Sequence, residues 1–310
     1  MGSHRLAGGL PAAPAGRAAV LGQPVAHSLS PVLHRAAYRE LGLSGWRYDA
    51  VECGVDDLPG FVAGLGPEWA GMSLTMPLKR VACTVADEAS PLVAEVGAAN
   101  TLVRCGGRWR VENTDVGGIV DALREAGVTG PSGWSGPTGA VLLGAGGTAQ
   151  AALAALRELG ERHPTVLVRD PSSTGELRAA ADRLGVAPVV VAGLADPVVY
   201  RAPLVISTVP RGAADVIADR AADRVDNPAA DRVADRAGWA RLDRPGVVFD
   251  VVYDPWPTPL ARSAGRAGRR VVGGLDLLLH QAVRQVRLMT GHTDVPVAAM
   301  RAALAGAARA

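Results

Sequence analysis

The clearest structural signal in the chain is the run Val141-Leu142-Leu143-Gly144-Ala145-Gly146-Gly147-Thr148-Ala149. Three apolar residues typical of a buried strand lead directly into a glycine turn, and an apolar helical pattern follows to Gly160. In a dinucleotide-binding fold, the first glycine permits the tight turn and the second lets the backbone approach a pyrophosphate. A small third residue lets helix and strand pack closely, and free N–H groups at the helix start attract phosphate. The sequence therefore predicts a cofactor-binding loop formed by Gly144, Ala145, Gly146, Gly147, Thr148 and Ala149.

Further apolar strands are predicted at 166–168, 189–191, 204–206 and 247–252, with helical patterns between them. Such an alternation indicates a parallel sheet covered on both faces. Arg169 and Asp170 directly follow the second strand, where the cofactor's ribose is recognised. An arginine there can face the 2′-phosphate of NADP, whereas an acidic residue holds the 2′-hydroxyl of NAD. Arg169 favours NADP, and Asp170 leaves NAD open as the alternative.

Polar residues with catalytic or binding chemistry gather in the N-terminal part of the chain, before residue 116. A strand at 18–21 precedes a helix that Ser30 is expected to cap, with Pro31 at its first position and Gly42 after its end. Ser28 and Ser30 place two hydroxyls beside that helix start, where an anion is favoured. The chain's only lysine, Lys79, closes the segment 73–79. The amides and hydroxyls of 100–101 and 113–114, with the carboxylate of Asp115, complete an inventory suited to a small polyhydroxylated acid.

The motifs carrying these residues resemble the shikimate dehydrogenase family. The matching segments follow one another in family order: 22–34, 73–79, 97–101, 113–118, 207–212, 250–253, 258–260 and 274–281. The segment Gly22-Gln23-Pro24-Val25-Ala26-His27-Ser28-Leu29-Ser30-Pro31 is similar to the family's opening signature. Ser73–Lys79 is similar to its Asn-Val-Thr-x-Pro-x-Lys segment.

The resemblance implies NADP-linked interconversion of 3-dehydroshikimate and shikimate, with Lys79 and Asp115 as the catalytic pair. It implies that Ser28, Ser30 and Tyr253 hold the substrate carboxylate. The residues implied for the ring hydroxyls are Thr75, Asn100 and Gln281, together with the catalytic pair. Gly274 is expected against the nicotinamide near Val251, and Thr208 and Val209 are expected in the cofactor site.

The chemistry agrees with this assignment. Hydride arriving at a carbonyl carbon builds negative charge on the oxygen, so a nearby donor must stabilise and protonate it. Lys79 can do both, and Asp115 can orient it; which of the two is the formal donor stays open. The alternatives are a quinate/shikimate dehydrogenase preferring NAD and, in another class, a non-catalytic NADP-binding sensor. Retention of both Lys79 and Asp115 argues against the sensor.

The chain departs from the family pattern at a few positions. Ser73 replaces the usual Asn and is expected to loosen the turn that presents Thr75 and Lys79. Arg35 and Ala99 replace an Asn and a Val, and 168–170 stand where the family often has Asn-Arg-Thr. The matched histidines are His27, His34 and His280, and we expect structural roles for them.

We expect an α/β protein of two domains with the active site in the cleft between them. The substrate domain would span 18–117 and be completed by C-terminal helices within 276–310. The doubly wound, Rossmann-like nucleotide domain would span 118–275, and 1–17 would be a flexible leader. Predicted details include a helix at 119–126, a linker at 128–139 and a solvated Ala-Asp-Arg helical insertion at 218–236. Two final helices are expected at 275–289 and 295–305.

Composition narrows the class of protein. The 310 residues carry a formal net charge of +2, which argues against a nucleic-acid partner because phosphate neutralisation needs a basic patch. No apolar run reaches the roughly 18 residues of a membrane span. Cys53, Cys83 and Cys105 lack the spacing of metal ligands, so no metal is expected and a reducing cytoplasm fits. The oligomeric state stays open, a homodimer included.

Overall fold

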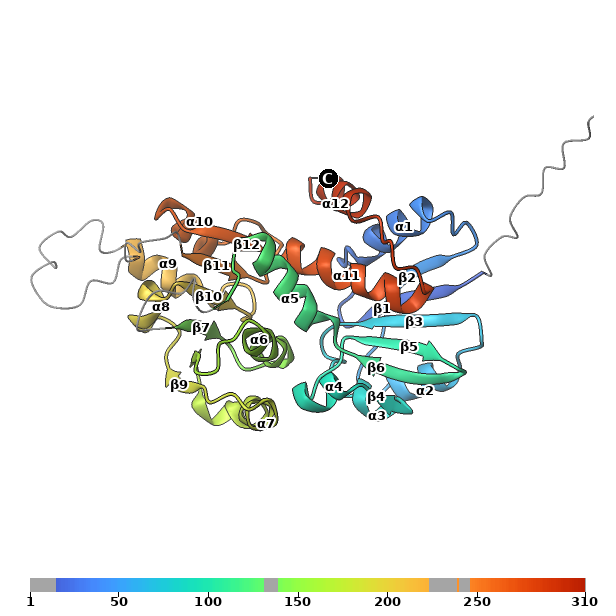
Figure 1. Cartoon of the computed structure of the whole chain (residues 1–310), viewed down its shortest axis with the longest axis horizontal. Helices are drawn as coiled ribbons and strands as arrows, with labels where there is room; N and C mark the ends of the chain where they lie inside the picture. The colour runs from blue at the N-terminus through green and yellow to red at the C-terminus, as the bar shows by residue number, and fades with distance from the viewer. Residues whose placement is uncertain (1–14, 131–138, 223–238, 240–245, 310) are drawn as a thin grey trace, which may run out of the picture.

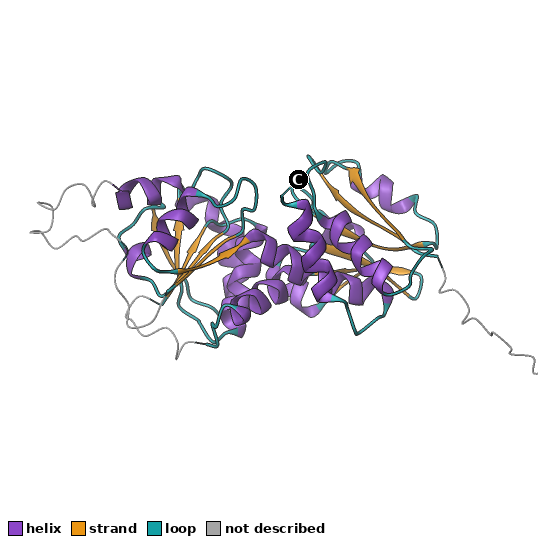
Figure 2. Ribbon diagram, turned by 90° about the horizontal axis from the view of Figure 1, so that it is seen from above, coloured by secondary structure: helices purple, strands orange, loops and turns teal. Residues whose placement is uncertain are grey.

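Two six-stranded sheets, each flanked by helices, form the two halves of the computed structural model (Figure 1). The structure describes residues 15–130, 139–222, 239 and 246–309. Seen from above, helices fill the space between the two sheets (Figure 2). The predicted α/β class with two sheet-based halves is confirmed.

The first sheet has the order β2-β1-β3-β5-β6-β4 and mixes parallel and antiparallel pairing. Its strands are β1 (Arg17–Gly22), β2 (Arg47–Glu52), β3 (Trp69–Leu74), β4 (Glu88–Ala89), β5 (Thr101–Cys105) and β6 (Arg108–Glu112). The helices that accompany it are α1 (Ser30–Glu40), α2 (Leu58–Ala63), α3 (Ala82–Val85) and α4 (Pro91–Val96). Leu21, Met72 and Leu102 bury one face of this sheet.

The second sheet is entirely parallel, in the order β12-β11-β10-β7-β8-β9. Its strands are β7 (Ala140–Leu143), β8 (Thr165–Val168), β9 (Val189–Ala192), β10 (Leu204–Ser207), β11 (Val247–Asp250) and β12 (Arg270–Gly273). Its helices are α6 (Gly147–Glu158), α7 (Gly175–Leu184), α8 (Val198–Arg201), α9 (Asp215–Ala222) and α10 (Pro259–Arg266), with a 3₁₀ turn η2 (Pro171–Thr174). The strand order reverses direction between β7 and β10, the position where doubly wound sheets bind ligands.

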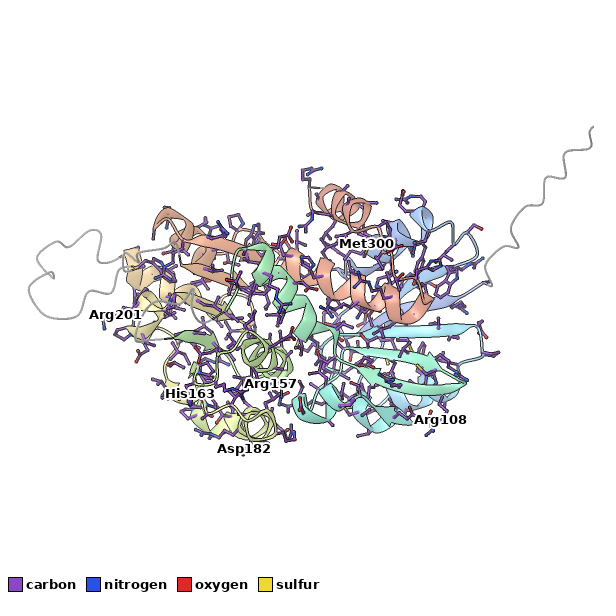
Figure 3. All side chains as sticks on the ribbon, viewed as in Figure 1. Arg108, Arg157, His163, Asp182, Arg201 and Met300 are labelled. Atoms are coloured by element: carbon purple, nitrogen blue, oxygen red, sulfur yellow. The ribbon has the colours of Figure 1, made fainter. Side chains whose placement is uncertain are left out.

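Two helices connect the halves: α5 (Thr114–Glu125) and α11 (Gly274–Thr290). The last helix, α12 (Val297–Ala307), packs on α1 and α11. α5 and α11 cross closely because α5 carries two glycines at the crossing. A Cβ on Gly118 would lie 3.0 Å from both the Cβ and the backbone N of Gln281. Beyond the crossing, Arg157 of α6 donates to Glu95 of α4 across the two halves (2.8 Å; Figure 3).

Several predicted boundaries were wrong for identifiable reasons. Leu29, not Ser30, is the N-cap of α1, and Ser30 is its first helical residue without a side-chain cap bond. The helix predicted at 119–126 begins at Thr114, because Asn113 caps it by accepting from the N–H groups of Asp115 and Val116. Arg17, assigned to the leader, begins β1 and pairs with Arg47.

Other predictions differ from the structure at the second sheet, and some fall on residues that the structure does not describe. β11 ends at Asp250, whose buried carboxylate accepts from Val252 N and Thr258 Oγ1 and so turns the chain. At the edge strand β9, Val189 is exposed rather than covered. Residues 1–14, most of the predicted linker and 223–236 of the Ala-Asp-Arg insertion lie outside the described residues.

The helix crossing generates a stability prediction. Gly118→Val should lower the free energy of unfolding by about 1–3 kcal/mol, because its methyl groups meet the backbone of α11. Gly117→Val is the matched control: it makes the same change in helix propensity, but its Cβ meets only the guanidinium end of the flexible Arg284 side chain. Urea unfolding measures both variants. Equal losses would show that the crossing distance does not depend on Gly118.

Candidate active site

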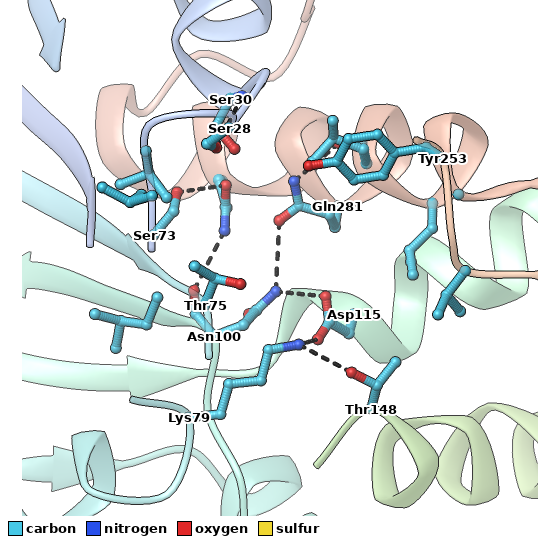
Figure 4. A pocket seen from close by; sticks show the side chains of 18 of the residues that line it. Ser28, Ser30, Ser73, Thr75, Lys79, Asn100, Asp115, Thr148, Tyr253 and Gln281 are labelled. Atoms are coloured by element: carbon cyan, nitrogen blue, oxygen red, sulfur yellow. Dashed lines mark hydrogen bonds and ion pairs between the residues drawn. The ribbon is translucent and has the colours of Figure 1, made fainter. Parts of the chain in front are cut away.

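A cavity of about 300 Å³ opens between the two halves of the molecule (Figure 4). Every residue expected to be catalytic or to bind substrate lines it: Ser28, Ser30, Thr75, Lys79, Asn100, Asp115, Tyr253 and Gln281. From the expected cofactor set, the cavity includes Thr148, Val251 and Gly274. The fold therefore brings together residues as distant in the sequence as Ser28 and Gln281.

An ion pair lies at the centre of the cavity. Lys79 Nζ donates to Asp115 Oδ2 at 2.5 Å, and the other carboxylate oxygen accepts from Asn100 Nδ2 at 2.8 Å. Lys79 comes from the loop after β3, and Asp115 lies in the first turn of α5. The Asp115 side chain is only 7% exposed, so its carboxylate depends on these two donors in place of water. A positioned ammonium with a buried carboxylate partner is suited to proton transfer.

Asn100 is held in one amide orientation by its neighbours. Its Oδ1 accepts from the backbone N–H of Thr114 (2.7 Å) and from Thr101 Oγ1 (3.0 Å), so Nδ2 must face Asp115. Nδ2 also approaches Gln281 Oε1 at 3.4 Å. The first turn of α5 and the start of β5 thus orient the groups around the ion pair.

The remaining predicted substrate residues lie on the walls around the pair. Figure 4 shows Ser28 and Ser30 side by side at one end of the cavity and Tyr253 at another. Ser30 is buried, whereas Ser28 and Thr75 are half-buried. Burial, and secondarily the charge of Asp254, raises the pKa of Tyr253, so its hydroxyl stays neutral at neutral pH. The Gln281 amide donates to Leu278 O (2.8 Å), which leaves its oxygen directed toward Asn100.

The sequence analysis did not predict a buried polar network that reaches the cavity wall at Ser73 and Gln285. Tyr48 donates to Ser73 Oγ (2.6 Å), and Ser73 donates to Gln285 Oε1 (2.7 Å). Gln285 Nε2 donates to Thr101 Oγ1 (3.0 Å), which continues to Asn100. The expectation that Ser73 loosens a turn was wrong, because Ser73 lies within β3 and is bonded on both sides. Gln285, one turn beyond Gln281 on a predicted helix, was the signal available in the sequence.

His34 completes this network in its neutral form. Its Nε2 donates to Gln285 Oε1 (3.2 Å), because an amide oxygen can only accept, and Tyr38 Oη approaches Nδ1 at 3.5 Å. Burial lowers the pKa of His34 to about 3, although the bond to Gln285 acts in the opposite direction. The structural role expected for His34 is consistent with this environment. His280 lies elsewhere, paired with Glu125 at 2.8 Å, and His27 lines the cavity.

The glycine loop between β7 and α6 is shaped for a phosphate group. Gly144 has φ +107°, which favours glycine, and a Cβ there would lie 2.8 Å from Thr208 Oγ1. Gly146 is extended and faces open space, and α6 begins there without a side-chain cap. Its first N–H groups are therefore available to an anion. Ala149 and Val209 are buried behind the loop, and this donor set fits a dinucleotide pyrophosphate.

Two expected cofactor residues lie beyond the cavity, at the end of β8. Arg169 and Asp170 are both exposed. Asp170 caps η2: its Oδ1 accepts from Ser172 N (2.8 Å) and its oxygens accept from Ser172 Oγ (2.7 and 2.8 Å). These bonds lower the pKa of Asp170. Its carboxylate is thus engaged within its own turn, while the exposed Arg169 side chain carries the positive charge at this strand end.

Gly274 has a packing function that the sequence did not reveal. A Cβ at this position would lie 2.1 Å from the carbonyl oxygen of Val251. The start of α11 can therefore approach the end of β11 only with glycine here.

Within the described ranges, there is no group of three or more His, Cys, Asp or Glu side chains arranged for a metal. None of the helices described is long and apolar enough to span a lipid bilayer.

A parallel sheet with a phosphate-binding loop, facing an ammonium–carboxylate pair across a cavity, is typical of dinucleotide-dependent enzymes. Comparison with known proteins defines the family. Residues 20–102 match the family model described as shikimate dehydrogenase substrate binding domain, and residues 274–305 match shikimate 5′-dehydrogenase C-terminal domain. A shikimate dehydrogenase (NADP(+)) of Sinorhizobium medicae strain WSM419 is 38% identical, covering 85% of this chain and 85% of its own length.

Solved structures agree with the sequence comparison. The shikimate dehydrogenase of Mycobacterium tuberculosis is 42% identical with a TM-score of 0.75, covering 94% of this chain and 99% of its own. A shikimate 5-dehydrogenase of Thermus thermophilus, in complex with NADP(H) and shikimate, is 32% identical with a TM-score of 0.74 and the same coverage. The chain belongs to the shikimate dehydrogenase family.

The neutral His34 generates a prediction for pH dependence. The unfolded chain binds a proton at His34 below about pH 6.5, while the folded chain resists protonation down to about pH 3. The contribution of neutral His34 to the free energy of unfolding is therefore fully present above about pH 6.5. It falls as the pH is lowered, with a slope of up to about 1.4 kcal/mol per pH unit. His34→Gln should flatten the decline between pH 7 and 5. The measurement is the free energy of urea unfolding between pH 7 and 5, for this variant and for the exposed control His292→Gln. If the slope of that free energy against pH is the same in His34→Gln as in the wild type, the prediction is contradicted.

Proposed function

We propose that this chain catalyses the reversible, NADP(H)-dependent interconversion of 3-dehydroshikimate and shikimate. The observation that carries the proposal is the Lys79–Asp115 ion pair inside a cavity lined by the eight expected residues. Its relatives named shikimate dehydrogenase (NADP(+)) support the choice of reaction and cofactor. We place the substrate domain at 18–117 with the helices of 276–310, and the nucleotide domain at 118–275.

The substrate is held by polar groups around the cavity. Ser28, Ser30 and Tyr253 supply hydroxyl donors for its carboxylate, which an apolar pocket could not hold. The ring hydroxyls bond to Thr75, Asn100 and Gln281, which line the same cavity. Holding both ends of the ring fixes its carbonyl relative to the lysine, which reduces the entropic part of the barrier.

Lys79, oriented by Asp115, carries out the proton transfer. In the reductive direction, the ammonium stabilises the negative charge that develops on the carbonyl oxygen and transfers a proton to it. In the oxidative direction, neutral Lys79 accepts the proton of the substrate hydroxyl. Asp115 orients Lys79 through its 2.5 Å contact, and Asn100 orients Asp115. When bound, NADPH supplies the hydride that converts the carbonyl to an alcohol.

The cofactor residues are assigned from the loop and strand ends. The N–H groups at the start of α6 face the pyrophosphate, with Gly144 and Gly146 providing the turn and the space. Arg169 faces the 2′-phosphate. The engagement of Asp170 with Ser172 supports NADP over NAD, because the carboxylate is committed to capping its own turn. Gly274 and Val251 form the nicotinamide wall, with Thr208 and Val209 beside the glycine loop.

The proposal extends to location and assembly. We infer a cytoplasmic enzyme acting on a small molecule, without a nucleic-acid or membrane partner, and a homodimer is the assembly to test by sedimentation. A quinate/shikimate dehydrogenase that prefers NAD, and a sensor without turnover, are the rival outcomes of the assay below.

The assay compares initial rates of oxidation of shikimate and of quinate, each with NADP and with NAD. We expect turnover of shikimate with NADP in the wild type. Lys79→Ala should lose at least about 100-fold in kcat, because general acid–base catalysis contributes that much. Lys79→Arg is the matched control: it keeps the positive charge but cannot release a proton, so it should be similarly impaired. NAD-linked quinate oxidation would assign the first rival, and cofactor binding without turnover would assign the sensor.

Cofactor choice has its own test. Arg169→Ala should raise the KM for NADP about tenfold or more, because a charge-assisted bond to phosphate is lost, and leave the KM for NAD unchanged. Arg162→Ala, an exposed arginine at the opposite end of β8, should change neither value. Asp170→Ala should leave NAD use unaltered. A fall in NAD use in Asp170→Ala would instead assign the ribose contact to that carboxylate.

A further inference from the structure

The ammonium of Lys79 has two acceptors in this structure, and only one of them is Asp115. The second is Thr148 Oγ1, at 3.2 Å from Nζ. Thr148 is the second residue of α6, on the nucleotide side of the cavity, whereas Lys79 and Asp115 belong to the substrate side. In Figure 4, dashed lines join the Lys79 amine to both side chains. Gly147 also lies against the lysine stem, since a Cβ on it would lie 3.7 Å from Lys79 Cβ and Cδ.

Two acceptors restrict the rotation of an ammonium group about its Cε–Nζ bond more strongly than one acceptor does. A tetrahedral nitrogen carries three substituents besides Cε; Asp115 and Thr148 engage two of its N–H groups. The third N–H is then directed into the remaining space, which is the cavity. After proton transfer, the neutral amine keeps its two N–H groups on the same acceptors, and its lone pair occupies the third direction. With Asp115 alone, this rotation is less restricted, and the neutral amine can turn either its second N–H or its lone pair toward the cavity, so the reacting direction is lost part of the time.

We propose that Thr148 is a positioning residue that aims Lys79 at the reacting oxygen, so that proton transfer depends on the contact between the nucleotide half and the substrate half. The inference rests on the proposed function. It is separate from phosphate binding, because the glycine loop binds phosphate through backbone N–H groups, to which a threonine hydroxyl is not essential. The Lys79–Thr148 bond bridges the two halves and forms only when α6 lies against the loop after β3. The lysine is thereby aimed when the cofactor-binding loop is in place beside it.

The kinetic test compares Thr148→Val, which keeps the shape and loses the hydroxyl, with Thr148→Ser, which keeps the hydroxyl. We expect kcat to fall about tenfold in Thr148→Val, the effect of one lost hydrogen bond. Its KM for shikimate and its Kd for NADP, measured by fluorescence titration, should stay within about twofold of wild type. The solvent deuterium isotope effect on kcat should rise, because proton transfer becomes slower. Thr148→Ser should restore wild-type kcat to within about threefold.

The second readout does not need turnover. Because Lys79 is the only lysine in the chain, ¹⁵N-lysine labelling gives a single side-chain ammonium signal that reports on this group alone. In the cofactor-free wild type and in Thr148→Ser, ¹⁵N relaxation should show slow rotation of the ammonium about its Cε–Nζ bond. In Thr148→Val and Thr148→Ala, this rotation should be faster.

The outcomes separate this inference from the proposed function. Absence of shikimate turnover in the wild type would overturn the proposed reaction, while the NMR comparison would still test the contact. Wild-type kcat in Thr148→Val, or a loss that appears as weaker NADP binding, would overturn the positioning role. An ammonium rotation rate in Thr148→Val equal to that of the wild type would do so as well. Thr148→Ala guards against a packing fault of valine, since both variants must lose kcat together.

Discussion

The close crossing of α5 and α11 is the constraint on which the site depends. α5 carries Asp115 in its first turn, and α11 carries Gln281 and Gln285. These side chains reach the same cavity because Gly118 lets the two helix backbones approach. A larger residue at that position would separate Gln281 from Asn100 and would move Gln285 away from β5. The distance between these two helices therefore sets the positions of the cavity side chains, and a substitution that changes the helix packing also changes the catalytic geometry.

The electrostatics of the cavity follow from burial. A carboxylate as covered as Asp115 is stable only with donors in place of water, and it has both an ammonium and an amide. The amide in turn is oriented by backbone and hydroxyl groups at the start of α5, and the chain of bonds continues through Gln285 to Ser73 and Tyr48. In this chain of bonds, each donor is already matched to an acceptor on the next residue, so the orientation of each polar side chain is fixed. The substrate thus meets a surface whose donors and acceptors are assigned before it binds, which is how preorganised sites lower barriers.

Much of this arrangement could be predicted from the sequence because its signals are local. The glycine loop, the apolar strands of the second sheet and the polar motifs around Lys79 each occupy a few consecutive residues with a direct physical meaning. The missed features depend on residues far apart. Ser73 was interpreted as a weak turn residue, since the sequence does not show that Tyr48 and Gln285 lie on either side of it. Ser30 was assigned a capping role because it precedes Pro31, yet the helix begins one residue earlier. The start of α5 was missed although Asn113 has the side chain of a good N-cap.

The return of the chain to the first half has a consequence for its synthesis. The apolar face of α1, with Leu33 and Ala37, is covered by Leu279, Ala282 and Val286 of α11 and by Met300 and Leu304 of α12. All of these partners are translated long after α1, once the whole second sheet has been made. While the ribosome is still making that sheet, the face has no native cover, and a nascent chain in this state is a target for chaperones. A polypeptide released before α11 would expose this face and would lack Gln281 and Gln285. An mRNA truncated near its 3′ end would therefore yield an aggregation-prone product with an incomplete cavity.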